Sequence, residues 1–137
     1  MDNLVDLMNK QMVNAIIETL PVELTIIDSK DEVVGWNKHK DRIFKRATNS
    51  IGVNFRQCHP VESLPLVERI VDEMRQRKRD KAVFWIDMPV TQGGKPHKIL
   101  IEFYALRDPS GNYIGCMECT QDIEEMRNLQ GQKRLLD

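Results

Sequence analysis

The sequence predicts a single α+β domain built on a five-stranded antiparallel sheet, with helices on one face and a flanking helix at each end. Segments with the two-residue alternation of strands occur twice early in the chain and three times in its second half, separated by turns. Segments with the spacing of amphipathic helices stand at both ends and between the two groups of strands. The 137 residues suffice for one hydrophobic core and leave no room for a second domain.

The first flanking helix is expected over residues 1–20, where apolar residues repeat along one helical stripe until Pro21 ends the helix. The stripe consists of Leu4, Met8, Met12, Ala15, Ile16 and Leu20. β-branched, alternating segments then predict the five strands. They are expected at 22–28, 33–37, 82–90, 98–107 and 113–120. Short polar turns make the first two strands one hairpin and join the last three in succession.

Two further helices are expected from their N-terminal signals. Ser63 is the expected N-cap of the longest internal helix, which ends in the basic run 75–79. Its apolar face is expected to consist of Leu66, Val67, Ile70, Val71 and Met74. Asp122 and Glu125 form an Asp-x-x-Glu capping box that opens a last helix over 123–137. The domain proper is therefore predicted over residues 21–122.

Charge and cysteine content exclude several classes of partner. The chain carries 20 basic and 21 acidic residues, so a net charge of −1 gives no general attraction for nucleic acids or anionic membranes. No apolar stretch approaches the length of a membrane span, and the N-terminus lacks the features of a signal peptide. Three cysteines, an odd number, fit a reducing compartment. We therefore expect a cytoplasmic protein.

Several motifs resemble those of the PAS domain family. Residues 35–38 (Gly-Trp-Asn-Lys) with 42–44 (Arg-Ile-Phe) resemble its first half, in which a strand ends in Asn before a short helix carrying Phe. Residues 108–115 followed by 120–123 resemble its C-terminal signature. More narrowly, the chain resembles the PAS module found beside hemerythrin-like domains in bacterial and archaeal proteins, in segments 20–23, 37–38, 58–60, 84–86 and 133–137. The resemblance implies a non-catalytic sensory or regulatory module in signal transduction.

Strand alternation divides the last three strands into two faces. We assign to the core Phe84, Ile86, Met88, Ile99, Ile101, Phe103, Ala105, Met117 and Cys119. The opposite face is amphipathic and contains Trp85, Asp87, Leu100, Glu102, Tyr104, Leu106, Ile114, Cys116 and Glu118. We expect the first helix to cover this second face, either within the same chain or from the other subunit of a homodimer.

The resemblance also implies a small-molecule site between sheet and helices. The side chains expected to line it are Trp36, Asn37, Phe44, Phe55, Phe84, Phe103 and Met117, with Cys58 and His59 at the rim. The aromatic and Met side chains equally suit a filled core, so a ligand-free dimerisation module is one alternative function.

The triplet at 58–60 (Cys-His-Pro) suggests a second alternative, because it precedes the longest internal helix, from which haem-binding PAS domains supply an axial ligand. A haem-dependent redox or gas sensor would then use His59 or Cys58. A loop His before Pro is also typical of a structural hydrogen bond, which leaves the cofactor open.

We expect neither catalysis nor a metal site. Cys58 and His59 are adjacent in the sequence and have no third group to orient them as a nucleophile and its base. Cys116 and Cys119 form a Cys-x-x-Cys pair, but positions three apart on a strand point to opposite faces.

Overall fold

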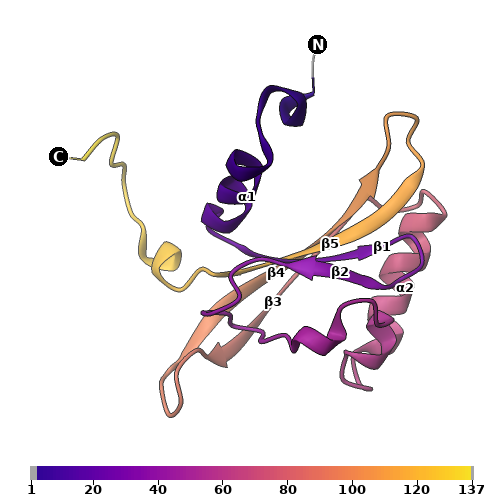
Figure 1. Ribbon diagram of the computed structural model, residues 1–137. Coiled ribbons are helices and arrows are strands. Elements are labelled where there is room, and N and C mark those ends of the chain that lie inside the picture. Colours follow the sequence, from indigo (N-terminus) through magenta and orange to yellow (C-terminus); the bar gives the residue numbers. More distant parts are fainter. Residues whose placement is uncertain (1–2, 137) are drawn as a thin grey trace.

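The computed structural model describes residues 3–136 and contains one five-stranded antiparallel sheet in the order β2-β1-β5-β4-β3 (Figure 1). Its strands are β1 (Glu23–Asp28), β2 (Val33–Trp36), β3 (Lys81–Pro89), β4 (Pro96–Arg107) and β5 (Tyr113–Asp122). The first and last strands pair along their length, which brings the two halves of the chain together. The predicted α+β class and five-stranded antiparallel sheet are confirmed.

The core lies between one face of this sheet and helix α2 (Leu64–Arg75). α2 turns Val67, Val71 and Met74 toward the sheet, as their helical spacing predicts. Two 3₁₀ turns, η2 (Thr48–Ser50) and η3 (Phe55–Gln57), lead into it. The buried cluster comprises Ile27, Val33, Trp36, Phe55, Val67, Val71, Met74, Ala82, Ile99, Ile101, Phe103 and Cys116.

Two local details of the helical segments differ from the sequence-based expectation. Ser63 precedes α2 as expected, but its hydroxyl donates to the carbonyl of Pro60 and makes no capping bond. The short helix implied before Phe44 is absent, and residues 38–45 follow an irregular path. The bond to Pro60 turns the Ser63 hydroxyl back along the chain, so its oxygen does not reach the backbone N–H groups of the first turn that a cap would accept from.

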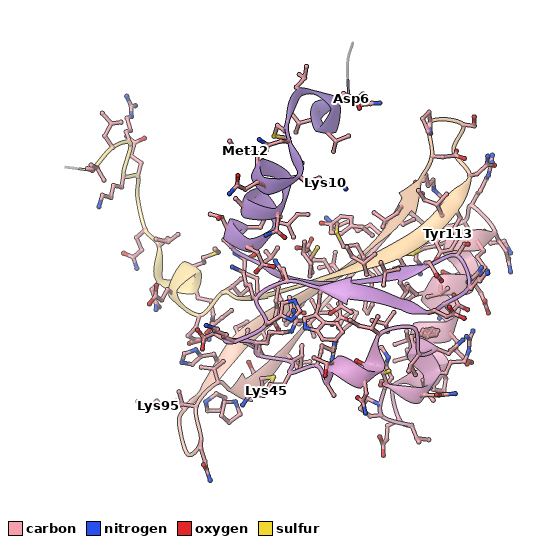
Figure 2. The ribbon with its side chains drawn as sticks, in the orientation of Figure 1. Asp6, Lys10, Met12, Lys45, Lys95 and Tyr113 are labelled. Carbon is pink, nitrogen blue, oxygen red and sulfur yellow. The ribbon has the colours of Figure 1, made fainter. Side chains whose placement is uncertain are left out.

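The N-terminal flanking segment is helical but interrupted, and it does not cover the sheet. A 3₁₀ turn, η1 (Leu4–Leu7), precedes helix α1 (Lys10–Thr19), and the side chain of Asn9 caps α1 by accepting from the Met12 amide at 2.8 Å. The predicted single helix is broken there because Asn favours the non-helical capping conformation. α1 has no buried residue, and Figure 2 shows it standing away from the sheet with Lys10 and Met12 on its flanks.

Asn37 attaches the end of α1 to the sheet. Its side chain is buried with 1% exposure, its Oδ1 accepts from the Leu24 amide at 2.6 Å, and its Nδ2 donates to the carbonyls of Ile17 and Val22 at 2.8 and 3.1 Å. Three hydrogen bonds in a buried place hold β1, β2 and the helix end together.

The predicted C-terminal helix over 123–137 is wrong for the described residues. Only a 3₁₀ turn, η4 (Glu125–Asn128), forms after β5, and Gly131 then adopts a positive φ of 61°. Asp122 accepts from the Glu124 amide at 2.9 Å but makes no capping box with Glu125. A short helix with no surface to pack on is marginal in water, so the amphipathic pattern alone is not sufficient.

The predicted faces of β5 are reversed. Cys116 pairs with Ala105 and therefore lies on the α2 side, whereas Met117 pairs with Tyr104 and lies on the outer face. By alternation Glu118 also points toward the helices, although a carboxylate is an unexpected inward residue. Both faces of β5 carry a mixture of apolar and polar side chains, so the sequence of this strand did not show which face points toward the helices.

Candidate functional site

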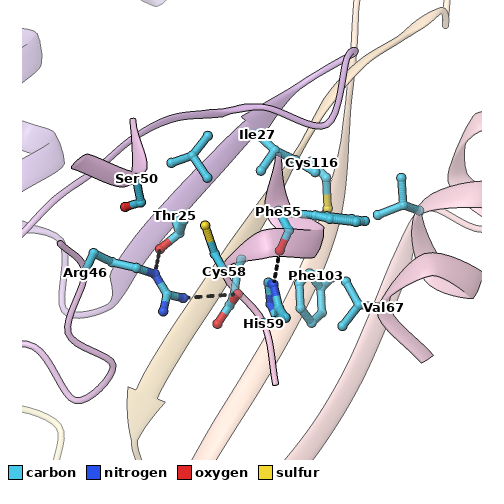
Figure 3. A pocket seen from close by; sticks show the side chains of 13 residues that line it. Thr25, Ile27, Arg46, Ser50, Phe55, Cys58, His59, Val67, Phe103 and Cys116 are labelled. Atoms are coloured by element: carbon cyan, nitrogen blue, oxygen red, sulfur yellow. Dashed lines mark hydrogen bonds and ion pairs between the residues drawn. The ribbon is translucent and has the colours of Figure 1, made fainter. Parts of the chain in front are cut away.

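A small cavity of about 40 Å³ lies between the sheet and the helices (Figure 3). Its inner wall is apolar and includes Phe55, Val67, Val71, Phe103 and Cys116. Its other lining residues are Thr25, Ile27, Val33, Arg46, Ser50, Cys58, His59 and Glu118. A space of this size holds a few water molecules and no larger guest.

The cavity continues into an open groove of about 610 Å³. One wall comes from residues 43–46, residues 58–63 and α2, and the other from Phe84 and Ile86 of β3 with Ile101 and Phe103 of β4. Six residues line both spaces: Arg46, Cys58, His59, Val67, Phe103 and Glu118. The groove has the volume and the apolar walls of a small-molecule site.

An inner Arg–Glu pair near the groove is fully occupied in holding the fold. The Arg42 guanidinium donates to the carbonyls of Phe44, Leu24 and Asn37 at 2.8, 3.2 and 2.7 Å. Glu23, whose side chain is as buried as that of Arg42, accepts from the amides of Ile43 and Phe44. Burial lowers the pKa of Arg42, and the nearby Glu23 opposes that shift.

A second Arg–Glu pair, at the mouth of the cavity, is bonded much more weakly. Arg46 Nη2 lies 3.7 Å from Glu118 Oε2, and Arg46 Nε donates to Thr25 Oγ1 at 3.4 Å (Figure 3). Glu118 accepts from the Thr120 hydroxyl at 3.4 Å. The two side chains are 19% and 13% exposed, so solvent reaches them only in part. Arg46 therefore has further donors, and Glu118 further acceptors, that are available to a group in the cavity.

His59 forms the rim between cavity and groove. Its Nδ1 lies 3.0 Å from the carbonyl oxygen of Phe55, an acceptor, so Nδ1 carries a proton and donates it while Nε2 is left free for another partner. The ring also meets the Phe55 ring edge to face, with centroids 5.9 Å apart. Cys58 is exposed beside it, with Sγ 3.8 Å from the Asn54 carbonyl oxygen.

The structure brings some of the predicted site residues together and places the others elsewhere. The cavity is lined by Phe55, Cys58, His59 and Phe103, and the groove by Phe44, Cys58, His59, Phe84 and Phe103. Trp36 is packed in the core and lines neither space. Asn37 and Met117 are corrected. The Asn37 side chain makes three hydrogen bonds to the backbone and is not available to a ligand. Met117 lies on the outer face of the sheet.

Sequence reasoning missed the polar lining residues Thr25, Arg46 and Glu118. Arg46 lies in an irregular segment and Glu118 in a strand whose inner face was misassigned. The available signal was Glu118, a charged residue among the apolar and Cys positions of β5. A Glu that points inward requires a basic partner, so it would have indicated an Arg or Lys nearby.

The enclosed cavity beside His59 is too small for a haem group, since it measures about 40 Å³. His59 and Cys58 also border the open groove of about 610 Å³, where the charged side chains of Arg46 and Glu118 lie beside them and no feature of the described residues marks either one as an axial ligand. We therefore derive no chemistry through haem.

Metal ligation has no support within residues 3–136, where no three His, Cys, Asp or Glu side chains lie close enough to hold an ion. Cys116 faces α2 and Cys119 pairs with Glu102 on the other face, as strand alternation predicts. Burial raises the pKa of the Cys116 thiol to about 12 and that of Cys119 to about 11, so both remain protonated.

The helices of the described residues are all too short or too polar to cross a membrane.

Residues 13–124 match the family described as PAS domain, and the chain belongs to that family. PAS domains are typically sensory or regulatory modules and are generally not catalytic. No curated protein matches the chain.

Among solved structures, the C-terminal domain of a Streptococcus mutans protein is similar at 26% identity, with a TM-score of 0.79, over 90% of this chain and 91% of that one. The PAS domain of a Colwellia psychrerythraea protein is 13% identical, with a TM-score of 0.59, over 84% and 97% of the two chains. A sensory box sensor histidine kinase from Vibrio cholerae is 16% identical, with a TM-score of 0.54, over 82% and 90%. The last two show the fold alone.

Proposed function

We propose that this PAS domain is a non-catalytic sensor that binds a small organic ligand in the groove and acts as a homodimer. The observation that carries the proposal is the continuity of the apolar groove with the interior cavity, across a rim of polar side chains. Apolar walls with a few convergent polar groups are the usual composition of ligand sites. A ligand entering the groove contacts β3, β4 and α2 together and can shift their packing.

The exposure of apolar groove walls favours this function over a ligand-free module. Phe84 and Ile86 lie on the helix side of β3, but no helix in the described part of the chain covers them. A filled PAS core would bury them, whereas here the segment opposite leaves an open space of about 610 Å³.

The ligand part is tested by thermal-shift screening of a fragment library, followed by NMR mapping of the hits. We expect hits that perturb the amides of Phe103 and Glu118. His59→Ala should weaken these hits while the melting temperature stays close to that of the parent chain. His39→Ala is the matched control, because His39 also contacts an aromatic ring, Trp36, but lies outside the groove. Hits that never touch the groove would contradict the proposal.

Dimerisation rests on two apolar surfaces that the single chain leaves uncovered. α1 exposes Met12, Ile16 and Ile17, and the outer sheet face exposes Val83 and Trp85, the latter to 63%. α1 is attached at its C-terminal end and projects away from its own sheet (Figure 1), so a second copy is the partner that brings helix and sheet face together.

The oligomeric state tests this part by light scattering coupled to size-exclusion chromatography. We expect a dimer for the parent chain, and a monomer for Trp85→Glu and for a chain lacking the residues before Leu20. Ile51→Glu is the control, since Ile51 is equally apolar and exposed but lies in a loop away from the outer face. If the truncated chain is still a dimer, the proposed role of α1 in dimerisation is wrong.

The resemblance to PAS modules beside hemerythrin-like domains supports a proposal about context. In a protein that carries both, this domain would regulate such a neighbour through its flanking segments.

A further inference from the structure

The polar end of the groove indicates what kind of ligand it takes, provided that the proposed ligand-binding function holds. Arg46 and Glu118 both line the cavity and the groove, and they carry the only opposite charges that meet there among the described lining residues. Lys45 also borders the groove, but its side chain is exposed and its charge is screened by solvent.

Comparison of the two Arg–Glu pairs shows that the outer one has unused capacity. Arg42 uses Nε, Nη1 and Nη2 in hydrogen bonds of 2.7 to 3.2 Å. Within residues 3–136, the Arg46 guanidinium makes a single hydrogen bond, the 3.4 Å contact to Thr25. Partly buried polar groups that lack partners bind polar groups strongly when a ligand supplies them.

The opposite charges of Arg46 and Glu118 limit the net charge that the head group of a ligand can carry. An anionic head group would pair with Arg46 but would lie against Glu118, and a cationic one would meet the reverse conflict. An apolar head would leave both side chains without partners after water is displaced. The two charges are both satisfied by a head group of zero net charge that offers an acceptor to Arg46 and a donor to Glu118.

The geometry agrees with this chemistry. Arg46 Nη2 and Glu118 Oε2 lie 3.7 Å apart, and both side chains line the cavity and the groove. An amide places its oxygen and its N–H side by side, so one planar group can accept from Arg46 and donate to Glu118 at the same time. The remainder of the molecule then lies along Phe103 and Phe84 in the groove.

We propose that the groove binds an uncharged ligand with an apolar or aromatic body and an amide-like edge, of the carboxamide, lactam or ureide class, held between Arg46 and Glu118.

A series of probes that share a phenyl ring and differ in the head group tests the proposal on the parent chain. The probes are benzamide, benzoate, benzamidinium and acetophenone, titrated at millimolar concentrations and followed by NMR at Phe103 and Glu118. We expect benzamide to bind about tenfold more tightly than each of the others, because each of them leaves at least one polar partner unsatisfied.

A double variant, Arg46→Met/Glu118→Met, removes both polar groups while keeping the side-chain volumes similar. It should bind benzamide about tenfold more weakly and acetophenone with little change. Arg69→Met/Glu73→Met is the matched control, because it removes an Arg–Glu pair from α2 outside the groove. Thermal denaturation of each variant checks folding, and the head-group series on the parent chain does not depend on any variant.

The outcomes separate the two proposals. Groove binding of benzoate, benzamidinium or acetophenone as tight as that of benzamide overturns the amide-edge inference and leaves the sensor function standing. Failure of all four probes while other fragments bind the groove has the same consequence. If no fragment of any kind perturbs the groove, the ligand-binding function itself is wrong, and the inference falls with it.

Discussion

Arg46 Nη2 lies 3.7 Å from Glu118 Oε2, beyond the range of a hydrogen bond, whereas the neighbouring Arg42 is saturated by backbone carbonyls at 2.7 to 3.2 Å. Thr25 connects the two arginines, since its Oγ1 accepts from Arg42 Nη2 at 3.0 Å and from Arg46 Nε at 3.4 Å. Two pairs of the same chemistry thus have different roles, one in the fold and one at the site.

This difference predicts unequal losses of stability. Arg42→Met should lower the free energy of unfolding by about 3–5 kcal/mol, because it leaves buried carbonyls and Glu23 without their partner. Arg46→Met should cost about 1 kcal/mol or less, as for a loosely formed pair near solvent. Urea unfolding followed by tryptophan fluorescence measures both, and similar losses for the two variants would show that Arg46 is also structural.

Asn37 is expected to hold α1 to the domain. Asn37→Ala should lower the free energy of unfolding by about 1–3 kcal/mol, because the Leu24 amide and the Ile17 and Val22 carbonyls lose a buried partner. Amide hydrogen exchange should speed up selectively along α1, which buries no residue of its own. Asn14→Ala, at an exposed position of the same helix, should change neither quantity.

The three thiols should differ sharply in reactivity. Burial raises the pKa of Cys116 to about 12 and that of Cys119 to about 11, whereas Cys58 is exposed at the groove. Titration of the native chain with a chromogenic disulfide near pH 8 should modify one thiol, and Cys58→Ala should abolish that reaction. The unfolded chain should show three reactive thiols. Rapid modification of Cys116 in the native state would mean that the sheet-to-helix interior opens readily.

The His97–Asp122 contact should make the C-terminal end of β5 sensitive to pH. His97 Nδ1 lies 2.7 Å from Asp122 Oδ2, and this hydrogen bond, together with the nearby carboxylates of Glu124 and Glu125, raises the pKa of His97. A raised pKa in the folded state means that the contact stabilises the fold fully below the ordinary His pKa of about 6.5. The stabilisation is then lost as the pH rises through the raised value.

NMR titration of the His97 ring measures this shift directly. Asp122→Asn should bring the pKa of His97 back toward its ordinary value, and the stability of this variant should change less than that of the parent over the same pH range. Glu62→Gln, distant from His97 in the chain and in a turn before α2, is a control of equal charge change. An unshifted His97 in the parent chain would show that the contact does not form in solution.

Local patterns were sufficient for the strands and for α2. The turns at 29–32 and 108–111 and the alternation between them placed all five strands to within about two residues of their observed ends. The helical spacing identified Val67, Val71 and Met74 as the buried face of α2, although Leu66, which was predicted on the same face, is 63% exposed.

The terminal segments were less predictable because their apolar stripes find no partner within the chain. The amphipathic pattern after Asp122 gave only η4, and the pattern before Pro21 gave a helix that packs on nothing. An amphipathic sequence forms a stable helix only where its apolar face can be buried.

The sequence by itself determined the fold class, the five strands, helix α2, and the separation of Cys116 and Cys119 onto opposite faces, since a two-residue period fixes which residues share a face. The tertiary structure alone decided that Cys116 and Glu118 face the helices and that Met117 does not, because the period does not say which face is inside. It also decided that Arg46 meets Glu118 while Arg42 meets the backbone carbonyl of Leu24. These contacts join residues far apart in the chain, and they exist only once β1 and β5 have paired and the segment before α2 has closed over them.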